Sequence, residues 1–111
     1  MNARPLRGEV DLPLHDGTVF TLRAGIGEFE ALDGEIAGGV QGFLDRTRDE
    51  QLRMPDVTTL IRLGMSGANP GAAPNLDDAR ALILAAGYPA AAAAALKLII
   101  VGLGLNKPKK D

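Results

Sequence analysis

Acidic residues are plentiful in this chain, but histidine and cysteine, the other residue types of acid-base and metal chemistry, are nearly absent. The only histidine, His15, stands in the segment LPLHDGTVF, where Asp16-Gly17 is typical of a tight hairpin turn. The chain has no cysteine, and it has no second histidine to complete a metal site or a catalytic triad. We therefore interpret His15 as a turn residue.

Two pairs of carboxylates could suggest a general acid and base, but helical geometry explains them better. Glu28 and Glu30 are two positions apart, and on a helix this turns them about 200° away from each other. Asp77 and Asp78 follow Asn75, where the first turn of a helix favours carboxylates. The segment AGIGEFE contains Gly-x-Gly but lacks the third glycine and the lysine of a phosphate-binding loop. We predict no catalytic residue, no cofactor site and no metal site, and hence a protein that is not an enzyme.

Length and charge indicate one domain that does not bind nucleic acid. At 111 residues the chain can bury one core, so we expect a single domain over residues 1–111. The net charge of −2 gives no field that would attract a phosphate backbone. The one basic cluster lies in residues 106–111, which we expect to be a disordered tail. The lack of cysteine and of an apolar leader favours a cytoplasmic protein.

The N-terminal region has the pattern of a β-hairpin over residues 8–23. Apolar and polar residues alternate in GEVDLPL, and the run TVFTLRA follows the Asp16-Gly17 turn. Pro13 lacks a backbone donor, which indicates an edge strand.

From residue 25 to residue 105 the apolar residues recur at steps of three and four, which predicts a helical bundle. Gly34 marks a candidate break between two short helices, and Pro55 suits the first turn of the next helix. Asn75 is a typical N-cap, and Gly87 is a typical helix stop. We predict an α+β fold, with an N-terminal hairpin followed by four or five helices. The apolar positions of the first helical stretch are Ile26, Phe29, Leu32, Ile36, Val40 and Phe43.

The last apolar stretch, YPAAAAAALKLIIVGLGL, allows three interpretations: a membrane span, a core helix, or a surface for another protein. It is shorter than the ~20 strongly apolar residues of a membrane span and contains Lys97, so we predict no membrane partner. The other two interpretations are compatible, because one helix can present a core face and a partner face. The residues expected in the core are Leu96, Ile99, Ile100 and Leu103. The residues expected to bind a partner are Leu98, Val101 and Leu105.

Four segments, in this order, resemble one known family. They are RGEVDLPLHDGTVFTLRA, GEFEALDGEIAGGVQGFL, VTTLIRLGM and NLDDARALILAAG. Together they resemble the small tail assembly chaperones of long-tailed phages, in the form encoded before the tape measure gene in the gene transfer agent clusters of alphaproteobacteria. The resemblance extends over nearly the whole chain.

This resemblance implies a non-enzymatic chaperone in the cytoplasm of the bacterial producing cell. It implies binding to the tape measure protein while the tail tube protein polymerises around it, then release, so that the chaperone is absent from the mature particle. Self-association is expected, and no cofactor is. The alternative is a small structural tail or neck component that is retained in the particle.

Overall fold

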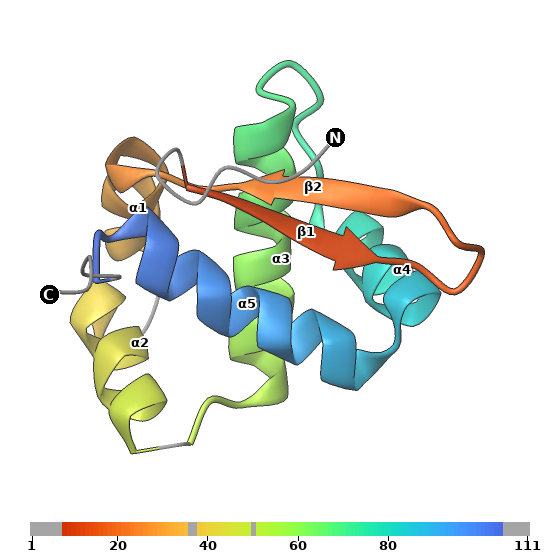
Figure 1. The fold of residues 1–111 in the computed structure, drawn as a ribbon. Helices are drawn as coiled ribbons and strands as arrows, with labels where there is room; N and C mark the ends of the chain where they lie inside the picture. The colour runs from red at the N-terminus through yellow and green to blue at the C-terminus, as the bar shows by residue number, and fades with distance from the viewer. Residues whose placement is uncertain (1–7, 36–37, 50, 106–111) are drawn as a thin grey trace, which may run out of the picture.

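In the part of the chain that the structure describes, two strands are followed by five helices (Figure 1). A computed structural model describes residues 8–35, 38–49 and 51–105. The elements are β1 (Glu9–Pro13), β2 (Val19–Arg23), α1 (Ile26–Asp33), α2 (Gly39–Arg48), α3 (Met54–Ala68), α4 (Leu76–Ala86) and α5 (Tyr88–Gly102). The α+β fold predicted from the sequence is confirmed.

β1 and β2 form an antiparallel pair with one apolar face. Val10 lies opposite Leu22, and Leu12 lies opposite Phe20. Val10, Leu12 and Leu22 are buried, and Phe20 is half-buried and packs against the core. Because side chains alternate across a strand, this pairing leaves one face of the hairpin for the helices.

The hairpin turn is held by short polar contacts and rests on α4. Asp16 Oδ1 accepts hydrogen bonds from Thr18 N at 2.9 Å and from Thr18 Oγ1 at 2.6 Å. These bonds stabilise the ionised carboxylate and lower the pKa of Asp16. Gly17 has a φ of 91°, which glycine adopts without strain. His15 is a turn residue, as predicted, and its backbone N donates to Ala85 O at 2.8 Å.

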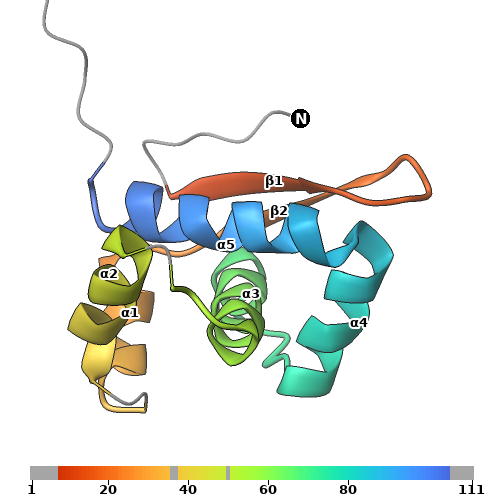
Figure 2. The same ribbon diagram turned by 90° about the horizontal axis from the view of Figure 1, so that it is seen from below.

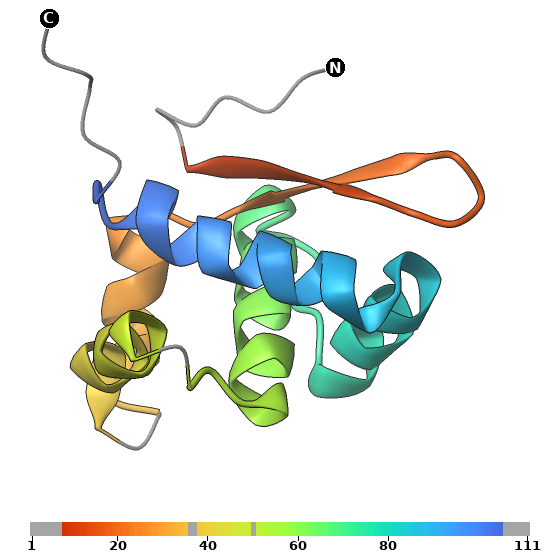
Figure 3. The ribbon, with the colours of Figure 1, turned by 60° about the horizontal axis from the view of Figure 1, so that its bottom comes forward.

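The helices cover the apolar face of the hairpin and flank α3 on both sides. β2 packs mainly on α3, and β1 packs mainly on α5. Figure 2 shows α3 nearly end-on beneath the hairpin, with α1 and α2 on one side and α4 on the other. Figure 3 shows α5 running past all of them, from α4 at its start to α1 and α2 at its end.

The core lies where the hairpin, α3 and α5 meet. Its largest fully buried side chains are Leu12, Leu22, Phe29, Leu32, Phe43, Val57, Leu60, Ile61, Leu98 and Ile99. Aliphatic residues from distant parts of the chain therefore share one interior. Within the described residues, no single helix is long and apolar enough to cross a bilayer; α4 and α5 meet that test only as a pair bent by 118°.

α1 and α2 are separate helices, as the glycine content predicted. Gly34 is the C-cap of α1, and Gly38 and Gly39 have φ values of 78° and 64°. Such positive angles suit glycine, so the chain can turn sharply here. Val40 N donates to Asp33 Oδ1 at 2.7 Å, which ties the start of α2 to the end of α1. Ile36, predicted on the same apolar stripe, lies outside the described residues.

The predicted boundaries of α4 are confirmed. Asn75 Oδ1 accepts a hydrogen bond from Asp78 N at 2.8 Å, and Asn75 N donates to Asp78 Oδ2 at 2.9 Å. This reciprocal capping box satisfies backbone donors at the helix start. Gly87, with a φ of 88°, ends α4 and leads directly into α5.

α5 ends in a Schellman motif that the sequence analysis did not identify. Leu105 N donates to Ile100 O at 2.8 Å, and Gly104 N donates to Val101 O at 3.3 Å. Gly104 has a φ of 71°, the left-handed conformation that this motif requires. The basic residues Lys107, Lys109 and Lys110 lie outside the described residues, so the expected disordered tail stays a prediction.

Three glycines allow other segments to approach the end of β2 closely. A Cβ at Gly67 of α3 would overlap the Arg23 carbonyl, and a Cβ at Gly8 would overlap the Ala24 carbonyl. A Cβ at Gly102 of α5 would lie 2.5 Å from Ala24 O. Any larger side chain at these positions would push the segments apart.

Candidate functional site

The partner-binding residues predicted on α5 do not share one exposed face. Leu98 is fully buried, Val101 is half-buried, and Leu105 is 48% exposed. Leu98 lies close to α3, since a Cβ at Gly64 would come within 2.9 Å of Leu98 Cδ1. The assignment of Leu98 to a partner face is therefore corrected: it belongs to the core. Partner binding by Val101 and Leu105 stays a prediction.

The predicted core face of α5 is also only partly right. Ile99 is fully buried, but Ile100 and Leu103 are half-buried, and Leu96 is 38% exposed. The buried positions of α5 are Ala91, Ala94, Ala95, Leu98, Ile99 and Gly102. They recur at steps of three and four, but half of them are alanines. The sequence analysis weighed only the large side chains, so the predicted stripe shares only Ile99 with the buried face of the helix.

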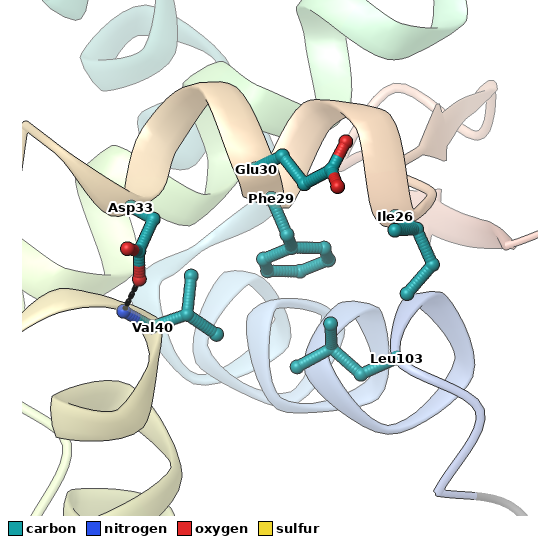
Figure 4. Close-up of a pocket in the computed structure, with 6 residues that line it drawn as sticks. All are labelled: Ile26, Phe29, Glu30, Asp33, Val40 and Leu103. Carbon is teal, nitrogen blue, oxygen red and sulfur yellow. Dashed lines mark hydrogen bonds between the residues drawn. The ribbon is translucent and has the colours of Figure 1, made fainter.

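One apolar hollow lies between α1, the start of α2 and the end of α5 (Figure 4). Its volume is about 310 Å³. Phe29, Val40 and Leu103 face one another across it, and Ile26 stands at its edge (Figure 4). We call it the acidic hollow, because its polar lining residues are Glu30 and Asp33.

The two carboxylates of the acidic hollow have different roles. Asp33 accepts the hydrogen bond from Val40 N, so it holds α2 in place. Glu30 is exposed and forms no hydrogen bond or ion pair with any residue that the structure describes. Glu30 is therefore the carboxylate that is available to a partner.

The second hollow lies between the end of α2, the start of α3 and the first half of α5. Its volume is about 300 Å³, and its lining residues are Thr47, Leu52, Val57, Tyr88, Ala92, Ala93 and Leu96. Among the residues that the structure describes, no charged side chain lines this second hollow. Two exposed cations, Arg53 and Lys97, follow lining residues in the sequence. Neither cation has an ion-pair partner within residues 8–35, 38–49 and 51–105.

An ion pair between half-buried Arg46 and buried Asp56 joins two of the helices that line the second hollow. Arg46 Nε and Nη2 donate to the two carboxylate oxygens of Asp56 at 2.7 and 2.8 Å. The guanidinium carbon of Arg46 also lies 5.2 Å from the centre of the Phe43 ring. Asp56 in turn accepts from Arg53 N at 3.0 Å. This network joins α2 to the start of α3, and because Asp56 is buried its charge needs the paired arginine.

Other apolar side chains are exposed outside the two hollows. Leu84 on α4 is 79% exposed, and Val19 and Met54 are exposed as well. No cluster of three or more histidine, aspartate or glutamate side chains that could hold a metal ion occurs in the part of the chain that the structure describes. Exposed aliphatic side chains and apolar hollows are features that protein-binding surfaces often share.

A family model described as phage tail tube protein, GTA-gp10, matches residues 7–106. The chain belongs to this family. The match covers the hairpin, all five helices and both hollows. No curated protein and no solved structure matches the chain.

Family membership confirms one part of the sequence interpretation and corrects two others. The expected relation to the tail proteins of phages and gene transfer agents is right. The expected chaperone function is wrong, because the family is one of tail tube proteins, which are structural components. The expected absence from the mature particle is wrong for the same reason. The alternative, a structural component that is retained in the particle, fits the family better.

Proposed function

We propose that this protein is a structural subunit of a phage-type tail tube and stays in the mature particle. The observation that carries the proposal is the family match over residues 7–106, which leaves almost no part of the chain outside it. The partners are other tail tube subunits or further copies of the chain itself. Binding to the tape measure protein stays a prediction.

The described surface supports a role in assembly. The sheet has two strands, so contacts with neighbours have to come from helix faces or from the hairpin edges. The exposed aliphatic residues and the two hollows lie mainly on helices. Apolar surface of this kind on a small domain is typical of a subunit that is covered by its neighbours.

The proposed role does not include catalysis. The one histidine of the sequence lies in the hairpin turn, and Asp78 serves as a helix cap. Glu28 is also a capping residue, since its Oε1 accepts from Gly25 N at 2.7 Å. The carboxylates that the sequence analysis weighed as an acid and base are thus partly explained by their structural contacts.

Quantitative mass spectrometry of purified particles tests the proposal. We expect the chain in mature, tailed particles, in a fixed ratio to the other tail proteins that is a multiple of the copies in one ring. The matched control is the lysate of the same cells, where free chain should also be found. If the chain is abundant in the lysate but absent from tailed particles, the proposed function is wrong.

A further inference from the structure

We propose that residues 106–111 fold back within the same chain and cover the acidic hollow, with a lysine side chain against Glu30. Two observations support this occupant: the charge of the hollow and the place where α5 ends. The inference does not depend on the proposed function. Residues 106–111 lie outside the described residues, and a disordered tail is the alternative that the experiment below tests.

The side of the hollow that α1 forms carries an excess of negative charge. Residues 25–35 contain four carboxylates and no basic residue. Three of these carboxylates accept a hydrogen bond from a described donor: Glu28, Asp33 and Glu35. The fourth, Glu30, is exposed and lines the hollow without a partner among the described residues. An occupant with a positive charge is therefore favoured over a purely apolar one.

The apolar floor of the hollow selects the kind of cation. Phe29, Val40 and Leu103 form this floor, and Glu30 lies beside it (Figure 4). A lysine side chain matches both features, because its four-carbon stem packs on apolar surface while its ammonium group stays near water and the carboxylate. An inorganic cation would gain nothing from the apolar floor. Lysine is therefore the residue type that fits this hollow.

The end of α5 brings lysines within reach of the hollow. Leu103 lines the hollow, and Lys107 follows it by four residues, a length of at most about 14 Å in an extended chain. Gly104 ends the helix in its left-handed conformation, so the chain leaves the helix axis at this point. Pro108 disfavours a helical conformation at Lys107. Because Glu30 lines the same hollow as Leu103, Lys107 can reach it while the described residues stay in place.

The absence of cysteine from the sequence allows a direct test on the full chain. Asp111→Cys provides a single attachment site for a nitroxide spin label, which broadens the NMR signals of nearby groups. We expect broadening of the methyl signals of Ile26 and Val40. In the same labelled chain, Glu30→Gln should reduce this broadening about two- to fivefold, as expected for the loss of one exposed ion pair. The control Asp77→Asn on α4 should leave it unchanged.

Two further measurements test the charge of the contact from the other side. The variant K107Q/K109Q/K110Q, which retains Glu30, should give the same reduction in broadening as Glu30→Gln. Raising the ionic strength from about 0.1 M to about 1 M should also reduce the broadening, because salt screens exposed charges. Thermal melts check that each variant is folded.

A mixing experiment distinguishes the chain's own tail from that of another copy. Spin-labelled chain without isotopes is mixed with isotope-labelled chain that lacks the spin label, and no broadening is expected. Broadening in the mixture would place the tail of another copy in the hollow and would overturn the inference. Lack of broadening at Ile26 and Val40 in the doubly labelled chain, or broadening that Glu30→Gln does not change, would indicate a disordered tail and overturn it as well. The proposed function is tested separately, by mass spectrometry of particles.

Discussion

At the scale of single residues, glycines at close approaches determine how tightly the hairpin is packed. Gly67 of α3 faces the Arg23 carbonyl, and Gly102 of α5 faces both Ala24 O and the Phe29 ring. The sequence analysis treated helical glycines as weak points, since each costs about 1 kcal/mol relative to alanine in a helix interior. Here the missing side chains allow α3 to reach the backbone of Arg23, at the end of β2, and α5 to reach the backbone of Ala24, which follows β2. A sequence alone cannot show this, because the neighbouring backbone lies far away along the chain.

We predict that Gly67→Ala lowers the free energy of unfolding by about 1–3 kcal/mol, because the new methyl group forces α3 away from β2. Gly27→Ala in α1 is the matched control. A Cβ there meets no atom within 4 Å, so alanine should be neutral or stabilise by up to about 1 kcal/mol. Urea denaturation measures both variants. Equal midpoints would show that α3 does not need the glycine.

At the scale of the elements, the sequence predicts where helices begin and end better than which way they face. The Asp16-Gly17 turn, the Asn75 cap and the Gly87 stop are local signals, and the structure places all three where they were expected. The orientation of α5 depends instead on the surfaces that α3 and β1 present to it. Ala91, Ala94 and Ala95 are buried because those surfaces come close, which composition does not reveal.

We predict that Ile99→Ala and Leu98→Ala each cost about 2–5 kcal/mol of stability, as truncation of a buried aliphatic side chain does. Leu105→Asp should leave the domain folded, within about 0.5 kcal/mol of the parent, since Leu105 lies half in solvent beyond the helix end. Thermal melts compare the three variants. A domain that is unfolded by Leu105→Asp, or unaffected by Leu98→Ala, would contradict this division of α5.

At the scale of the whole molecule, the hollows combine elements that are distant in the sequence. The acidic hollow joins α1, α2 and the end of α5, and the second hollow joins α2, α3 and the start of α5. No sequence period connects Glu30 with Leu103, so neither hollow could be predicted from the pattern of residues. The chaperone interpretation went wrong at this scale as well. A chaperone and a tube subunit both need apolar helix surfaces, and the sequence pattern alone does not distinguish the two roles.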